Sequence, residues 1–156
     1  MHAVMHAVIL DIDGTLLSSN EVDDSLYLAA VRRVLGQVKV RESWSLYRNV
    51  TDGGILHEIL SDNSLTHSAA TLTAVRDIFV ESIRQHIERV GPFIEIPGAR
   101  EFVAGLRASN SYRVAYATGA GLHRRALSLK ALSSLAVFRW HRPTITRIGS
   151  RSWSMR

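Results

Sequence analysis

The pattern of apolar and polar residues divides the chain into strand-like and helix-like segments. Residues 4–10 and 112–117 are nearly continuous apolar runs, which are typical of strands buried on both faces of a parallel sheet. Elsewhere apolar residues recur three and four positions apart, as on one face of a helix. This spacing predicts helices at 21–35, at 55–60, at 66–90, from Pro97-Gly98 to 106, and at 123–132. Gly91-Pro92 ends the third helix, and residues 51–54 predict a turn before the second.

The order of these elements predicts an α/β fold. A strand is followed by helices, then by a further helix, a second strand and a last helix. This order is typical of a parallel sheet that a helical insertion interrupts after its first strand. We expect a core formed by residues 1–16 and 91–138, a helical insertion at 17–90 and an aberrant basic tail at 139–156. Function in such sheets lies at the carboxyl ends of the strands, which is where Asp11 and Thr118 stand.

The composition excludes several classes of protein. None of the 156 residues is Cys, which rules out disulfides and thiolate metal sites and fits a reducing cytoplasm. Residues 1–10 have no basic leader and only a short apolar run, so they predict neither a signal peptide nor a membrane span. We therefore expect a cytoplasmic protein that has no membrane partner.

The net charge of +5 hides an asymmetry along the chain. Residues 1–101 contain all 14 acidic residues but only nine of the 19 basic ones, whereas residues 102–156 contain ten basic residues and no acidic one. A basic segment can mark nucleic-acid binding, or it can have an origin different from that of the rest. The tail has no recognition helix, zinc motif or spaced stacking aromatics, so nucleic acid is not favoured as a partner.

One segment carries most of the candidate chemistry, the string Ile-Leu-Asp-Ile-Asp-Gly-Thr-Leu-Leu at residues 9–17. Two carboxylates, Asp11 and Asp13, leave a strand two positions apart and can converge on one Mg²⁺ ion, which prefers oxygen ligands. The first carboxylate can attack phosphorus, and the second can act as a general acid and base. Gly14 permits the sharp turn between them and the next segment. An isolated Asp-x-Asp more often forms a turn or a helix cap, but the whole string favours catalysis.

This string resembles motif I of the haloacid dehalogenase-like superfamily. The resemblance implies a Rossmann-like core, Mg²⁺ as cofactor and a small phosphorylated metabolite as substrate. It implies that Asp11 is the nucleophile and a Mg²⁺ ligand. It also implies that Asp13 is the general acid and base and gives its backbone carbonyl to the metal. The second Asp is typical of the phosphatases and phosphomutases in the superfamily, so hydrolysis of a carbon–halogen bond is disfavoured.

The second strand resembles motif II of the same superfamily. Residues 114–119 form an apolar strand that ends in Thr118-Gly119, which would hold the phosphoryl oxygens through the hydroxyl and nearby backbone N–H groups. Thr-Gly after a strand is by itself usually a turn, but the Pro97-Gly98 helix start before this strand is common in the superfamily. The two resemblances together cover roughly residues 4–135.

The insertion at 17–90 resembles a C1-type cap, which closes over the site, excludes water and selects the leaving group. The Thr51-Asp52-Gly53 segment is either a cap loop that faces the site or a hairpin between cap helices. We expect Trp44 and Tyr47 in the core of the cap rather than in contact with substrate. The seven His residues show no metal-binding spacing.

Two further motifs of the superfamily are not recognisable. Motif IV requires Asp residues after a further strand, but no acidic residue follows Glu101. For motif III, Lys130 lies within a predicted helix, and Arg142-Pro143 only imitates the pattern. A shift of the reading frame after Phe138 would let the codons of residues 143–145 encode two Asp residues, so we expect a truncated or frameshifted gene with an incomplete sheet.

The sequence therefore leaves two hypotheses of different classes. The favoured one is a haloacid dehalogenase-like hydrolase that cleaves phosphoric monoesters through an aspartyl-phosphate with Mg²⁺, with activity impaired by the missing motif IV. The alternative is a non-catalytic product whose basic tail binds polyanions or nucleic acid.

Overall fold

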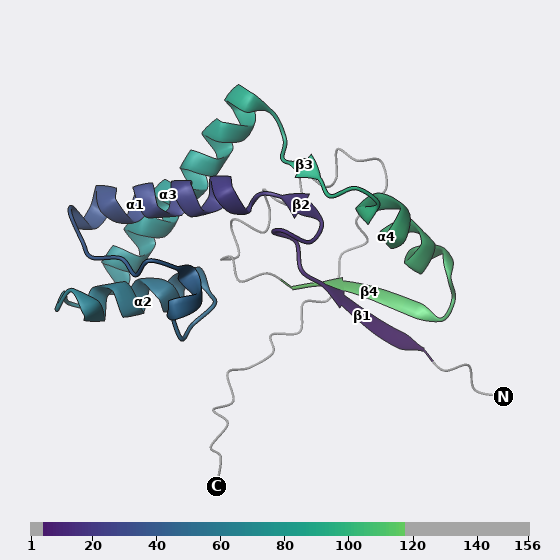
Figure 1. Cartoon of the computed structure of the whole chain (residues 1–156), viewed down its shortest axis with the longest axis horizontal. Coiled ribbons are helices and arrows are strands. Elements are labelled where there is room, and N and C mark those ends of the chain that lie inside the picture. The colour runs from purple at the N-terminus through teal and green to yellow at the C-terminus, as the bar shows by residue number, and fades with distance from the viewer. Residues whose placement is uncertain (1–4, 118–156) are drawn as a thin grey trace, which may run out of the picture.

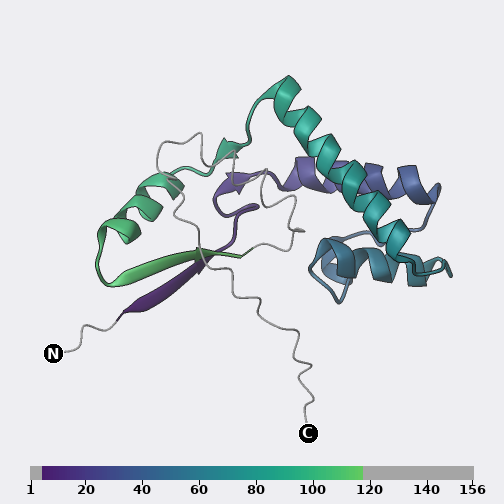
Figure 2. The ribbon, with the colours of Figure 1, turned by 180° about the vertical axis from the view of Figure 1, so that it is seen from behind.

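The structure, a computed structural model, describes residues 5–117 and shows a mixed α/β fold. Its elements are β1 (His6–Leu10), β2 (Leu17–Ser18), α1 (Asn20–Leu35), η1 (Trp44–Leu46), α2 (Asp52–Asp62), α3 (Ala69–Val90), β3 (Ile94–Glu95), α4 (Ala99–Ala108) and β4 (Tyr112–Tyr116). The three helices α1–α3 gather on one side, and β1, β4 and α4 lie together on the other (Figures 1 and 2). No helix of the described part is long and apolar enough to cross a membrane.

The strands β1 and β4 pair in parallel, with the register running from His6 opposite Tyr112 to Leu10 opposite Tyr116. The predicted parallel sheet is therefore confirmed, and its two carboxyl ends lie side by side. The chain between these strands makes the helical excursion and returns through α4 (Figure 1).

A second pairing joins the two ends of the helical segment. Leu17 and Ser18 of β2, directly before α1, pair antiparallel with Glu95 and Ile94 of β3, which follows α3. The sequence pattern did not reveal this ladder, because two residues per strand are too few for a period of two to be recognised. The ladder holds the start and the end of the helical segment next to the string at residues 9–17.

The sheet is covered differently from the prediction. Leu10 and Tyr116 pack with the buried Val103 of α4, but Ile9 on the opposite face of β1 is 65% exposed. The expectation of strands buried on both faces is wrong within the described residues. An apolar run in the sequence does not show whether one or both faces of a strand are covered. In this structure α4 covers one face of the β1–β4 pair.

The helices α1–α3 enclose their own hydrophobic core. Its buried members come from all three helices and from the connection between α1 and α2: Tyr27, Ala30, Val31, Tyr47, Leu56, Ile59, Leu60, Val75, Phe79 and Ile83. A separate hydrophobic cluster joins Ile12 and Leu17 of the string at residues 9–17 to Val103 of α4. The burial of Tyr47 confirms its prediction as a core residue.

Capping chemistry sets the helix boundaries. The Thr51 hydroxyl accepts a hydrogen bond from the Gly54 N–H, so residues 52–54 form the first turn of α2. The separate turn predicted at 51–54 is therefore wrong. Ser68 caps α3 in the same way, and Gly91 ends it as expected. Gly98 precedes α4 in the left-handed conformation, with a φ of 82°.

Candidate active site

The residues after β1 form a tight loop anchored by apolar side chains. The carbonyl oxygen of Ile12 accepts hydrogen bonds from the N–H groups of Leu16 and Leu17, at 2.9 and 3.0 Å. Ile12 and Leu17 are each 1% exposed, so they fix the loop against the core. Because side chains alternate along an extended chain, Asp11 and Asp13 are on the opposite side from Ile12. The Asp-Ile-Asp pattern thus buries its middle residue and presents both carboxylates together.

A buried serine orients the second carboxylate. The Ser19 hydroxyl donates a 2.8 Å hydrogen bond to Oδ1 of Asp13, and Ser19 is only 1% exposed. Ser19 precedes α1, where a serine ordinarily caps the helix, yet its side chain makes no capping bond. The sequence offered no signal for this contact, since a serine before a helix predicts a cap.

Asp11 and Asp13 open into a cavity of about 370 Å³ whose other walls come from the helical segment. These walls are formed by the first turns of α1 and α2 and by the connection that carries η1. The lining on this side includes Asn20, Asp23, Asp24, Tyr27, Trp44, Asn49, Asp52 and Phe79. The structure therefore brings the string at residues 9–17 and the predicted cap residues to one hollow.

The Thr51-Asp52-Gly53 segment borders two cavities. Asp52 lines both the cavity that holds Asp11 and Asp13 and a smaller, mostly apolar cavity of about 230 Å³ between α2 and α3. Thr51 and Gly53 line only the smaller one. The segment is the start of α2, neither a loose cap loop nor a hairpin.

Aromatic side chains separate these two cavities. The buried Tyr27 hydroxyl donates a hydrogen bond of 2.5 Å to the backbone carbonyl of Asp52. Burial, together with the Asp52 carboxylate, raises the pKa of Tyr27, so this hydroxyl stays neutral. The Tyr27 ring meets Trp44 and Phe79 edge to face, with centroids 5.9 and 5.2 Å away. Trp44 thus packs against the core as predicted, but it also lines the cavity with Asp11 and Asp13.

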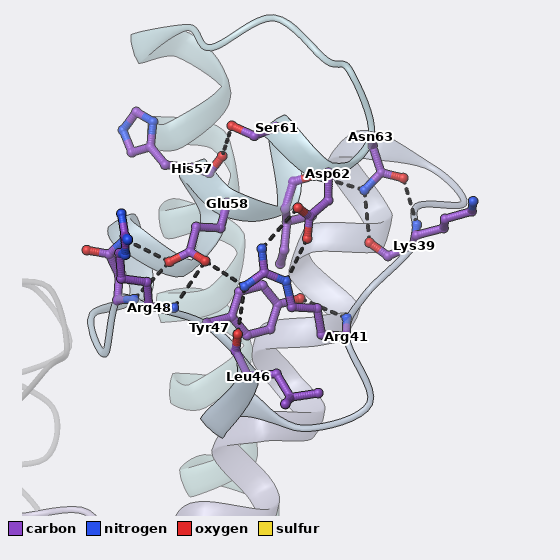
Figure 3. A network of polar contacts seen from close by, with 12 residues as sticks. Lys39, Arg41, Leu46, Tyr47, Arg48, His57, Glu58, Ser61, Asp62 and Asn63 are labelled. Carbon is purple, nitrogen blue, oxygen red and sulfur yellow. Dashed lines mark hydrogen bonds and ion pairs between the residues drawn. The ribbon is translucent and has the colours of Figure 1, made fainter.

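The connection between α1 and α2 is held in place by Glu58 of α2 (Figure 3). Its carboxylate accepts hydrogen bonds from the backbone N–H groups of Arg48 and Asn49, at 3.1 and 2.8 Å, and from the Asn49 side chain at 2.8 Å. The backbone N–H of Arg48 and the Asn49 and Arg41 donors outweigh partial burial and hold the pKa of Glu58 at about 2. This anchoring fixes the part of the cavity wall that carries Asn49.

Arg41 completes the same network (Figure 3). Its guanidinium forms ion pairs with Glu58 at 2.7 Å and with Asp62 at 2.8 Å, and it lies 4.5 Å from the centre of the Tyr47 ring. It also donates to the backbone carbonyl of Leu46 at 2.8 Å. The planar guanidinium therefore joins the connection to α2 at several points, which a lysine could not do.

The predicted phosphate-binding residues Thr118 and Gly119 lie outside the described residues, as do Lys130 and Arg142. The last described contact of this segment is a 2.9 Å hydrogen bond from the Ala117 N–H to the Leu10 carbonyl. Within residues 5–117, no group of three His, Cys, Asp or Glu side chains is arranged to hold a metal ion.

Two solved structures share this fold. One is a hydrolase from Pseudomonas syringae, with a TM-score of 0.63 and 20% identity over 82% of this chain and 56% of its own. The other is a predicted phosphoglycolate phosphatase from Haemophilus somnus 129pt, with a TM-score of 0.57 and 15% identity over 88% of this chain and 61% of its own. This chain thus spans less than two thirds of the length of either protein. No family model and no curated protein matches the sequence.

Proposed function

We propose that the cavity around Asp11 and Asp13 is the phosphoryl-transfer site of a haloacid dehalogenase-like phosphohydrolase. The observation that carries this proposal is that both carboxylates of the string open into one hollow whose far wall belongs to the inserted helices. The arrangement fits a nucleophile on the core beneath a cap at residues 17–90. Two solved structures of the same fold, described as a hydrolase and a predicted phosphatase, also support it.

The donor set fits Mg²⁺ only in part. Asp11 and Asp13 supply two hard oxygen ligands, and Mg²⁺ usually keeps waters and takes its remaining ligands from a substrate phosphate. When bound, the ion would neutralise charge on the phosphoryl oxygens. The described residues offer no third carboxylate placed to hold it, and no acidic residue follows Glu101. We therefore infer that turnover by this chain is impaired.

The protein's own residues account for the two chemical steps. The Asp11 carboxylate attacks phosphorus, the bond to the leaving alcohol breaks, and Asp13 gives that alcohol its proton. Asp13 then removes a proton from water, which attacks the phosphorus of the aspartyl-phosphate and releases inorganic phosphate and the Asp11 carboxylate. Ser19 positions Asp13 through its 2.8 Å hydrogen bond. The alternative, binding of polyanions or nucleic acid by the basic tail at 139–156, falls on residues outside those that the structure describes.

The first half-reaction tests this proposal without requiring full turnover. We expect acetyl phosphate and Mg²⁺ to phosphorylate the full chain, seen in intact mass as the gain of one phosphoryl group. Asp11→Asn should abolish the gain, because an amide cannot attack phosphorus. The control Asp77→Asn changes an exposed carboxylate on α3 and should be phosphorylated like the wild type. Phosphorylation that persists in Asp11→Asn, or never occurs, would overturn the proposal.

The impairment is tested separately. Hydrolysis of an aryl phosphate in Mg²⁺ should be near background for this chain and should rise when the alternate reading frame after Phe138 is restored. In the restored protein, Asp13→Asn should slow hydrolysis by roughly 10²- to 10⁴-fold, the usual contribution of general acid–base catalysis. Equal rates for the two chains would show that the tail does not limit the reaction.

A further inference from the structure

Two exposed histidines meet across the connection between α2 and α3. His57 belongs to α2, and His67 lies directly before Ser68, the cap of α3. Their Nδ1 atoms are 2.7 Å apart, and their rings lie with centroids 4.9 Å apart and planes 20° from parallel. Neither ring lines the cavity that holds Asp11 and Asp13, so this contact does not depend on the proposed function.

A serine determines which ring donates to the other. The Ser61 hydroxyl donates a 3.0 Å hydrogen bond to the backbone carbonyl of His57 (Figure 3). A hydroxyl has one proton to donate, so Ser61 accepts from Nε2 of His67, which lies 3.0 Å away. The proton of neutral His67 is therefore on Nε2, and its bare Nδ1 accepts from the Nδ1–H of His57. The three residues close a ring of hydrogen bonds in which each residue both donates and accepts.

The bond between the two rings exists only in some protonation states. One additional proton can enter at Nε2 of His57, which no described contact uses, and this leaves the bond between the Nδ1 atoms in place. A second additional proton must occupy Nδ1 of His67, and two N–H groups then face each other at hydrogen-bond distance. Both rings are positive in that state, and like charges at this separation repel. The bond therefore requires that at least one ring be neutral.

The surroundings of the pair do not compensate a second positive charge. Residues 63–66 and 68–75 contain no acidic or basic side chain. The charged residues of α2 and α3 that are nearest in sequence pair with other groups: Glu58 and Asp62 with Arg41, and Arg76 with Asp77. Among the described interactions, neither ring has a charged partner from any other element. The N-terminus of α3, next to His67, is partially positive and opposes further positive charge there.

We propose that His57 and His67 form a pH-sensitive clasp between α2 and the start of α3. The clasp is closed while at least one ring is neutral, and it opens when both rings are charged. Histidine is the side chain that ordinarily changes charge between pH 5 and 8, so acidification below this range opens the clasp. The two helices that it joins supply Asp52 and Phe79 to the wall of the larger cavity.

A double-mutant cycle measures this contact directly. The full chain, His57→Ala, His67→Ala and the double variant are unfolded in urea at about pH 7.5 and at about pH 4.5. At the higher pH the two changes should be non-additive by about two- to tenfold in the folding equilibrium constant, the contribution of one hydrogen bond. At the lower pH this coupling should vanish or change sign, because the charged rings no longer bond. Titration of carboxylates cancels, since all four proteins contain them.

His86 provides the matched control. It lies on α3 against Phe93, with ring centroids 5.6 Å apart, and no described interaction joins it to His57. A cycle between His57→Ala and His86→Ala should therefore be additive at both pH values. Non-additivity of the same size in this control cycle would show that the effect does not belong to the pair.

The proposal fails on either of two measurements. Additive effects of His57→Ala and His67→Ala at about pH 7.5, or equal coupling at both pH values, would overturn the clasp, because a shared proton requires coupling that acid removes. Nitrogen-15 spectra of the imidazoles give a test that does not depend on stability. At about pH 7.5 they should show a proton on Nδ1 of one of the two rings, and protons on Nε2 of both would leave none between them and overturn the proposal.

Discussion

Gly14, the residue after Asp13, provides a quantitative test of how the loop that carries the two carboxylates is built. Its φ of 77° lies in the left-handed region that favours glycine. A Cβ at this position would also come too close to the Asn20 side chain, overlapping Nδ2 and lying 3.1 Å from Cγ. Gly14→Ala therefore combines a backbone penalty with a side-chain clash.

The two penalties have different sizes. An L-residue in the left-handed region costs about 1–2 kcal/mol. The clash involves the end of a flexible side chain, so Asn20 can rotate away at a cost of about 0.5–1.5 kcal/mol, that of an unfavourable rotamer. We expect Gly14→Ala to lower the free energy of unfolding by about 1.5–3.5 kcal/mol, the two costs combined.

Two other glycines act as matched controls in urea denaturation. Gly98 has a φ of 82° and open space where a Cβ would project, so Gly98→Ala should show the backbone penalty alone, about 1–2 kcal/mol. Gly105 lies within α4 with open space and no positive φ. Gly105→Ala should therefore stabilise the chain by about 1 kcal/mol through helix propensity.

A double variant separates the two contributions at Gly14. Adding Asn20→Ala removes the clash, so the double variant, compared with Asn20→Ala alone, should lose about as much stability as Gly98→Ala. If Gly14→Ala unfolds at the wild-type urea concentration, the left-handed loop is not required. If the Asn20 change gives no relief, the clash does not contribute.

Two further predictions concern the helical segment and the sheet. Ile59→Val, at a fully buried position, should lower the free energy of unfolding by about 0.5–1.5 kcal/mol. Ile9→Val, at a 65% exposed position, should change this free energy by less than about 0.5 kcal/mol. Equal losses of stability in urea denaturation would contradict the assigned burial of the two residues. Because the pKa of Glu58 is lowered from 4.5 to about 2 in the folded chain, this carboxylate adds stability above its unfolded pKa that is lost as the pH falls towards 2. Urea midpoints of Glu58→Gln should therefore fall less steeply than those of the wild type over this acidic range, and parallel curves would refute the role of the Arg48 and Asn49 contacts.

The elements that could be predicted from the sequence are those with a long or repeated pattern. The helical spacing of residues 21–35 and 66–90 predicted α1 and α3 to within a few residues, and the two apolar runs predicted a parallel pair that is present. The start of α2 was misplaced because Thr51-Asp52-Gly53-Gly54 has the composition of a turn, and only the Thr51 capping bond shows it to be helical. Burial on both faces of β1 could not be decided from an apolar run alone.

The sequence marked the two carboxylates of the candidate site, Asp11 and Asp13, but not the other residues of the cavity that they line. Asp11 and Asp13 are adjacent in sequence to the strand that places them, so local pattern is enough to mark them. Asp24, Trp44 and Asp52 reach the same cavity from three separate segments. Their meeting depends on the packing of α1 against α3 and on the Glu58 anchor, neither of which has a local signature.

The reactive loop and the cavity wall differ in how freely their residues can change. The residues that would act on the phosphoryl group are fixed by a short loop with a buried Ile12 and a left-handed Gly14, where most substitutions carry a steric cost. The wall is fixed instead by contacts such as those of Glu58 with Arg48 and Asn49, and the exposed Asp24 contributes charge without supporting the core. A substitution at Asp24 is therefore expected to change the charge of the cavity wall while the fold and the positions of Asp11 and Asp13 stay as they are. The loop and the wall can change independently because they belong to different segments that are held by different contacts.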